Sequence, residues 1–120
     1  MFFKKLTGDK GENFACNLLK KKGFSIVERN FRTNLGEIDI IAREKDVLIF
    51  VEVKTRSSKK FGEPQEAVKY KKQQTIKKVA MCYLKEKNLV DKVSVRFDCL
   101  AILGTDERDF EAEHIENAFW

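Results

Sequence analysis

The sequence is poor in cysteine, histidine and proline, and these shortages exclude several classes of protein. Its three cysteines, Cys16, Cys82 and Cys99, are an odd number without C-x-x-C spacing, so neither a disulfide framework nor a zinc site is predicted. We expect all three to be small, reduced core residues. The single histidine, His114, is expected to be structural, and the lack of a glycine-rich phosphate loop argues against NTP hydrolysis.

Long apolar runs are also missing. The longest stretch, Val47 to Val51, is far shorter than the roughly 20 residues that span a membrane. The first residues lack the apolar region typical of a signal peptide. We therefore expect a cytoplasmic protein without membrane contact. The 120 residues, 42% of them hydrophobic, are enough for one domain, residues 1–120, around a single core.

Positive charge is concentrated in one quarter of the chain. From Lys54 to Lys78 there are nine basic and two acidic residues, a local charge of +7, whereas the whole chain carries +5. Clustered lysines and arginines suit nucleic acid, because phosphate contacts release condensed counterions. A solvated lysine-rich helix face explains the charge equally well, so the charge needs support from a motif.

The residue pattern predicts an α/β domain with a mixed central sheet flanked by helices. Helices are expected from the capping residues 7–9 to Gly23, and from Pro64 to Lys87. Strands are expected at residues 24–32, 37–43, 47–55 and 93–103, with a crossover through the second helix. The acidic stretch 106–116 leads into an apolar terminus that we expect to dock on the body.

The strands at residues 37–43 and 47–55 form a predicted hairpin with a turn centred on Lys45 and Asp46. The paired residues are then Ile40 with Val51, Asp39 with Glu52, and Glu37 with Lys54. One face is entirely apolar: Ile38, Ile40, Ala42, Val47, Ile49, Val51 and Val53. The other face is mixed: Glu37, Asp39, Ile41, Arg43, Leu48, Phe50, Glu52 and Lys54. A slip by one residue would destroy the apolar face, so the register is well specified.

Asp39 and Glu52 are the central candidates for a functional site. Directly opposed, their Cβ atoms would lie about 4.5 to 5.5 Å apart, where like charges destabilise a sheet unless something compensates. Two carboxylates, with the backbone carbonyl of Val53, match the oxygen coordination of partly hydrated Mg²⁺. Lys54 points the same way and could orient a water or stabilise a phosphate.

The competing interpretation is a surface network of carboxylates and lysine that only solubilises the sheet. It fits poorly, because apolar residues on the same face require a covering helix, and polar groups at its edge then need partners. Glu12, at the border of the first helix's apolar stripe, is expected beside Asp39 if that helix packs on the sheet. Glu37 has an alternative role as the salt-bridge partner of Lys54.

Several motifs extend along nearly the whole chain: Gly11-Glu12 with Ala15, Asn30-Phe31-Arg32, Gly36-Glu37-Ile38-Asp39-Ile40-Ile41, Phe50-Val51-Glu52-Val53-Lys54-Thr55-Arg56, Lys72-Gln73, Arg96-Phe97-Asp98, and His114-Ile115 with Asn117-Ala118-Phe119. Together they resemble the PD-(D/E)XK nuclease superfamily. More narrowly, the sequence resembles the bacterial YraN-like family, which is related in fold to archaeal Holliday junction resolvases. Ile38 stands where the superfamily name has Pro, a variation that leaves the ligands intact.

The resemblance implies a restriction-endonuclease-like core and a Mg²⁺- or Mn²⁺-dependent endonuclease that hydrolyses DNA, including branched DNA. Asp39 and Glu52 would be the metal ligands and Lys54 the catalytic lysine. Glu12 would be an auxiliary carboxylate, and Gln73 a residue of the active-site helix.

The basic segment is expected to bind phosphates that flank the cleavage site, without reading sequence. The residues assigned to this role are Arg56, Lys59, Lys60, Lys69, Lys71, Lys72 and Gln73. Symmetric cleavage of two strands would favour a homodimer. Two alternatives stay open: a nucleic-acid-binding module of the same fold without catalysis, and an interaction protein whose acidic stretch 106–116 folds over its own basic segment.

Overall fold

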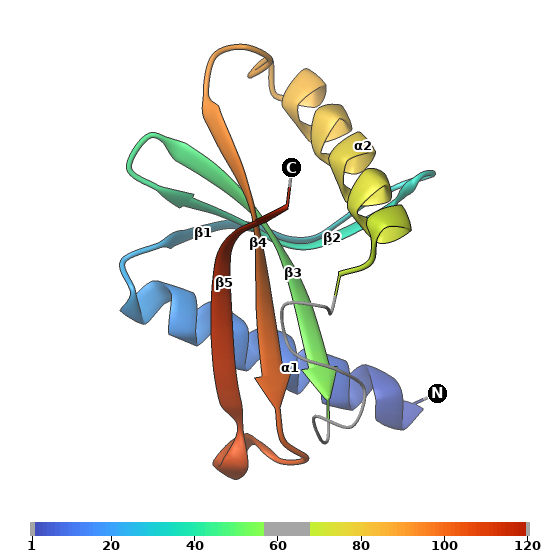
Figure 1. Ribbon diagram of the computed structural model, residues 1–120, viewed down its shortest axis with the longest axis vertical. Helices are drawn as coiled ribbons and strands as arrows, with labels where there is room; N and C mark the ends of the chain where they lie inside the picture. Colours follow the sequence, from blue (N-terminus) through green and yellow to red (C-terminus); the bar gives the residue numbers. More distant parts are fainter. Residues whose placement is uncertain (1, 57–67, 120) are drawn as a thin grey trace.

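The computed structural model describes residues 2–56 and 68–119 of the chain, with side chains from residue 10 onward (Figure 1). The elements in chain order are α1 (Phe2–Lys21), β1 (Ser25–Thr33), β2 (Gly36–Glu44), β3 (Val47–Arg56), α2 (Tyr70–Glu86), β4 (Ser94–Leu103), the short 3-10 helix η3 (Glu107–Asp109) and β5 (Glu111–Phe119). No helix in this part of the chain is long and apolar enough to cross a membrane.

The strands form one mixed sheet in the order β1-β2-β3-β4-β5. All neighbours are antiparallel except β3 and β4, which are parallel. Parallel neighbours need a crossover connection, and α2 lies in the segment between them. The predicted α/β class and mixed sheet are therefore confirmed.

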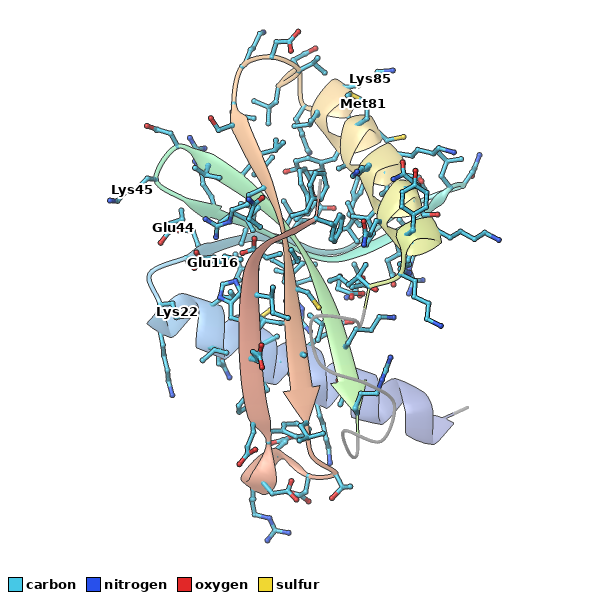
Figure 2. All side chains as sticks on the ribbon, in the orientation of Figure 1. Lys22, Glu44, Lys45, Met81, Lys85 and Glu116 are labelled. Carbon is cyan, nitrogen blue, oxygen red and sulfur yellow. The ribbon has the colours of Figure 1, made fainter. Side chains whose placement is uncertain are left out.

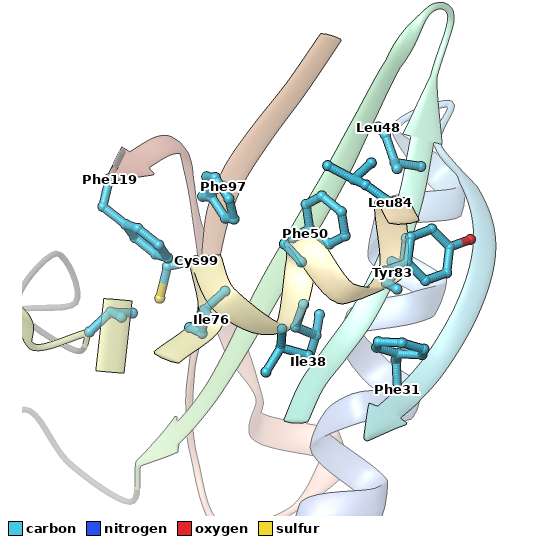
Figure 3. Packing of buried hydrophobic residues seen from close by; sticks show 14 residues of the cluster. Phe31, Ile38, Leu48, Phe50, Ile76, Tyr83, Leu84, Phe97, Cys99 and Phe119 are labelled. Atoms are coloured by element: carbon cyan, nitrogen blue, oxygen red, sulfur yellow. The ribbon is translucent and has the colours of Figure 1, made fainter. Parts of the chain in front are cut away.

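The two helices cover opposite faces of the sheet. On one face α1 packs its buried Ala15, Cys16 and Leu19 against an apolar cluster that includes Ile40 and Ile49. On the other face α2 packs against a larger, aromatic cluster (Figure 3): Phe31, Ile38, Phe50, Tyr83, Phe97 and Phe119. Because helices cover both faces of the sheet, β3 is nearly continuously hydrophobic in sequence.

The boundaries of three elements differ from those predicted. The first helix begins at Phe2, ahead of the capping residues 7–9. The second helix begins at Tyr70, after Lys69 with its extended backbone, and Pro64 lies outside the described residues. The acidic stretch 106–116 is not a free tail: it forms η3 and most of β5, an edge strand paired with β4. Backbone pairing stabilises this strand despite its exposed glutamates.

The predicted hairpin register is confirmed from Ile40–Val51 to Glu44–Val47. The pairing ends there, so the expected direct opposition of Asp39 to Glu52 and of Glu37 to Lys54 is wrong. The predicted position of Ile38 on the face of Ile40 is also wrong, because Ile38 packs with α2 and Ile40 with α1. The side-chain alternation of β2 breaks at Asp39.

A left-handed residue in β1 accompanies this break. Asn30 has φ 54°, a conformation that asparagine tolerates better than most residues. Arg29 pairs with Ile40 and Phe31 with Ile38, so Asn30 lies at the level of Asp39. Arg29 reaches α1, where it contacts Asn13, whereas the Phe31 ring packs on Tyr83 of α2. In both strands, therefore, the alternation of side chains between the two faces is interrupted at the same level of the sheet.

A buried carboxylate, Asp98 of β4, fixes β5 to the sheet. Asp98 is fully buried and accepts two hydrogen bonds from Arg96, one from His114 Nε2 at 2.7 Å and one from the backbone N–H of Asn117. Burial alone would raise the pKa of Asp98, but the His114 and Arg96 hydrogen bonds outweigh it and hold this pKa below its usual range. His114 is thus held in a structural network, as expected, and Cys16 and Cys99 are buried free thiols while Cys82 is half-buried.

Candidate active site

Asp39 bridges β2 and β3 where their hairpin pairing ends. Its carboxylate accepts a hydrogen bond of 2.8 Å from the backbone N–H of Val53. The side chain of Glu52, the residue before Val53, is close enough to the Asp39 carboxyl group to raise its pKa. The two carboxyl groups therefore meet as predicted, although by a side-chain bridge instead of a regular cross-strand pair.

The environment of Asp39 opposes a negative charge. Burial, together with the neighbouring charge of Glu52 and the hydrogen bond between the two side chains, raises the pKa of Asp39 to about 8. The Val53 N–H acts in the opposite direction, and the charge of Glu12 adds a smaller upward contribution. At neutral pH the pair therefore favours a shared proton or another cation between its oxygens.

Two lysine side chains approach Glu52, which is only 4% exposed. Lys54 Nζ lies 3.4 Å from Glu52 Oε2, and Lys72 Nζ lies 3.8 Å from the same oxygen. Lys54 comes from β3 and Lys72 from the first turns of α2, so the helix that covers the sheet also completes the group. We call Asp39, Glu52, Lys54 and Lys72 the carboxylate–lysine cluster.

Glu12 lies at the edge of the carboxylate–lysine cluster. It is near enough to raise the pKa of Asp39, but its own carboxylate pairs with Arg29 at 3.4 Å. Burial raises the pKa of Glu12, while the hydrogen bond and charge of Arg29 lower it. The preceding Gly11 lets α1 approach β3, since a Cβ there would lie 2.5 Å from Thr55 Oγ1.

The other predicted site residues have different partners or are exposed. Glu37 pairs with Arg32 and not with Lys54. Gln73 donates a hydrogen bond to the backbone carbonyl of Val68, which fastens the first turn of α2 to the preceding segment. Three basic residues assigned to nucleic acid are exposed: Arg56, Lys69 and Lys71. Lys59 and Lys60 lie outside the described residues.

The donor set suits an ion that keeps most of its water. Among residues 10–56 and 68–119, no three His, Cys, Asp or Glu side chains are grouped so that they could enclose a metal. Mg²⁺ is typically bound through one or two carboxylates, with water and substrate phosphate completing its shell. Asp39 and Glu52 would supply those two carboxylates.

Two side chains near the site were not assigned their present places from the sequence. Lys72 was expected among the phosphate-binding residues and not beside Glu52. Its position four residues before the buried Ile76 could have indicated that it faces the sheet, since residues four apart share a helix face. Arg29, the partner of Glu12, gave no comparable signal, because its orientation depends on the left-handed Asn30.

Comparison with known proteins finds similarity along nearly the whole chain, as the distribution of the motifs does. The model of the "Uncharacterised protein family UPF0102" matches residues 11–102. A UPF0102 protein of Geotalea daltonii is 50% identical over 96% of this chain and 90% of its own length. UPF0102 proteins of Alkaliphilus oremlandii and Dictyoglomus turgidum are 48% and 46% identical, over 96% and 93% of this chain and 98% and 95% of their own lengths.

Proposed function

Because the chain belongs to the UPF0102 family, whose description names no activity, its function has to be argued from the site, and we propose that it is a Mg²⁺- or Mn²⁺-dependent endonuclease acting on DNA. The observation that carries the proposal is the carboxylate–lysine cluster. Asp39 lies beside Glu52 in a place that raises the pKa of Asp39, and the ammonium groups of Lys54 and Lys72 lie 3.4 and 3.8 Å from Glu52.

The arrangement supports placement in the PD-(D/E)XK superfamily. Asp39 and Glu52-Val53-Lys54 lie on adjacent strands of a mixed sheet that is covered by a helix on each face. Glu12 on α1 is close enough to influence Asp39, which suits an auxiliary carboxylate. These features support the superfamily resemblance proposed from the motifs.

The reaction proposed is hydrolysis of a phosphodiester bond, in which water attacks phosphorus and the bond to the leaving oxygen breaks. A divalent ion bound by Asp39 and Glu52 would supply an acidified water and neutralise phosphate charge. Lys54, 27% exposed and held beside Glu52, would orient the attacking water and stabilise the growing charge on the phosphate oxygens. Arg56, Lys69 and Lys71 would bind the flanking backbone.

The proposal is tested by a cleavage panel of linear, flapped and four-way branched DNA with Mg²⁺, Mn²⁺ or EDTA. We expect metal-dependent cleavage that falls by at least about 100-fold in the Asp39→Asn and Lys54→Met variants. Binding to DNA in EDTA should persist in both variants. Asp46→Asn, an exposed carboxylate at the β2–β3 turn, is the matched control and should cut like the wild type.

The main rival is a nucleic-acid-binding module without catalysis. Wild-type protein that binds DNA but cuts no substrate with either metal would establish this rival and overturn the nuclease proposal. The same conclusion would follow from residual cleavage that is equal in wild type and both site variants, because such activity would come from a contaminant.

A further inference from the structure

The outer face of α2 carries a straight row of lysines that begins at Lys71 and continues away from the site. Lys71, Lys78 and Lys85 are all exposed and are spaced seven residues apart. The buried side of the helix is formed by Ile76, Val79, Ala80, Tyr83 and Leu84. Seven residues are nearly two full turns, so the three lysines lie along one line. That line is opposite the buried side and points away from the sheet.

We propose that this lysine row, defined as Lys71, Lys78 and Lys85, is a binding surface for the backbone of a DNA duplex that extends away from the active site. The inference rests on the proposed function, because it concerns the part of the DNA substrate that extends beyond the cleavage site. Neighbouring lysines of the row are about 10.5 Å apart, and the whole row is about 21 Å long. At about 3.4 Å per step it matches six base-pair steps.

The charges around the row favour a polyanion. From Tyr70 to Lys85 the helix contains no acidic residue. The ion pairs found among the described residues involve none of the three lysines. Unpaired lysines in a line repel one another, and phosphates relieve this repulsion while releasing counterions.

Both ends of the row lead to further positive groups. Lys71 is followed by Lys72, whose ammonium reaches Glu52 in the carboxylate–lysine cluster. At the other end, Lys85 lines a surface pocket with Asn88, Val90 and Lys92. Figure 2 shows Lys85 and Met81 at this end of α2, away from the strands. A phosphate backbone lying on the row would therefore continue toward the active site in one direction and toward Lys92 in the other.

A duplex suits this surface better than a single strand. Proteins that bind single strands usually offer several aromatic side chains on which bases stack. Of the aromatic residues described, Tyr70 alone is largely exposed, at 74%, and the other large apolar residue exposed on α2 is Met81. A rigid row of equally spaced charges fits a regular, stiff backbone.

The test compares two triple variants with the same loss of charge. One replaces Lys71, Lys78 and Lys85 by glutamine; the control replaces Lys20, Lys21 and Lys45, which are exposed on α1 and at the β2–β3 turn. Affinity for a fluorescent duplex of about 20 base pairs, roughly three times the length of the row, is measured in EDTA at several salt concentrations. In EDTA a metal-dependent nuclease leaves the duplex intact.

For the lysine-row variant we expect the slope of log affinity against log salt to decrease by about 2.7, or 0.9 for each lost phosphate contact. Its Kd near 0.1 M salt should rise roughly tenfold or more. The control variant should change the slope by less than about 1. If the triple variant does not fold, judged by circular dichroism, Lys78→Gln alone should lower the slope by about 0.9.

Equal affinities and slopes for wild type and the lysine-row variant would overturn the inference, as would an equal loss in the control. Equal losses on duplex and single strand would overturn the assignment to duplex. Wild type that binds anionic lipid vesicles and no DNA would assign the row to membranes and overturn it as well. Binding that depends on the row, without cleavage in Mg²⁺ or Mn²⁺, would keep this inference and reject the nuclease.

Discussion

Lys54 and Lys72 approach one carboxylate oxygen of Glu52 from two different elements, and their surroundings suggest different roles. Lys54 is the more enclosed, with 27% of its side chain exposed against 43% for Lys72. Lys54 lies on β3, two residues after Glu52, with its ammonium group 3.4 Å from that carboxylate. Lys72 sits at the rim on α2, where a long flexible side chain can turn from Glu52 to an incoming phosphate.

Replacing Lys72 by methionine should therefore change metal affinity and cleavage in opposite directions. The ammonium 3.8 Å from Glu52 repels a cation held by that carboxylate, so Lys72→Met should bind Mn²⁺ severalfold more tightly in calorimetry. The variant also loses a phosphate contact, so kcat should fall by roughly 10-fold to 100-fold. Circular dichroism should show unchanged helix content, because methionine is a good helix former.

Lys20→Met, on α1 at the other face of the sheet, is the matched control for this experiment. It should change neither the affinity for Mn²⁺ nor the rate. A Lys72→Met protein with weaker Mn²⁺ binding and slower cleavage would show instead that Lys72 merely supports the shape of the site.

At the scale of the elements, the site depends on the level where β1 and β2 reverse their faces. The reversal places Arg29 toward α1 and Phe31 toward α2, and it lets the Asp39 carboxylate reach the Val53 N–H of β3. Asn30 makes this possible through its left-handed backbone. The side chain of Asn30 also hydrogen-bonds to Glu12 and lowers its pKa, although burial and Arg29 have larger effects.

A β-branched residue at position 30 should damage both the strand and the site. Asn30→Val should lower the free energy of unfolding by about 1 to 2 kcal/mol, because the left-handed conformation brings Cβ close to the following carbonyl oxygen. Asn30→Gly should cost less, since glycine has no Cβ. Urea unfolding of the three proteins measures the difference. Equal stabilities of the Val and Gly variants would contradict this explanation of the reversal.

The same elements show what the sequence could predict. Alternation of apolar and polar residues around the Lys45–Asp46 turn was enough for the register of β2 and β3 from Ile40–Val51 onward. This pattern also predicted that Asp39 and Glu52 lie close together, because each is the next residue beyond the Ile40–Val51 pair. The side of the sheet on which Ile38 lies could not be predicted, because side chains stop alternating between the two faces where a strand twists at an irregular residue.

Other differences have equally local causes. The start of α2 was misplaced because the apolar stripe does not fix where a helix begins, and the extended backbone of Lys69 provides the observed N-terminal boundary. The strand β5 was missed because Glu111, Glu113 and Glu116 make it resemble a solvated tail. Its stability comes from β4 and from the Asp98 network, which join residues far apart in sequence.

In the whole molecule, folding encloses the two carboxyl groups with Lys54 and Lys72 at the site and leaves other basic groups outside. Arg56 and the lysine row stay exposed, while Asp39 and Glu52 are enclosed between β2, β3 and α2. The metal-free protein therefore carries an electrostatic strain that a bound cation would relieve. This strain should be visible in the stability of the entire fold, because the carboxyl pair regains full hydration only on unfolding.

The free energy of unfolding of the metal-free protein should consequently fall as pH rises. Unfolded Asp39 loses its proton near its ordinary pKa of 3.8, whereas burial and Glu52 keep the folded carboxyl protonated up to pH about 8. Between these values the folded state binds the extra proton, so stability declines with rising pH across this range. Asp39→Asn should lack this decline in urea titrations at pH 5 and pH 8.

A divalent ion should replace the missing proton, so Mn²⁺ should raise the melting temperature of the wild type more at pH 8 than at pH 5. At pH 5 the ion must displace the proton of Asp39, whereas at pH 8 that proton is already partly lost. Asp39→Asn should show little response at either pH, and Asp46→Asn should behave like the wild type. An equal rise at both pH values in all three proteins would place the ion elsewhere and remove Asp39 from the metal site.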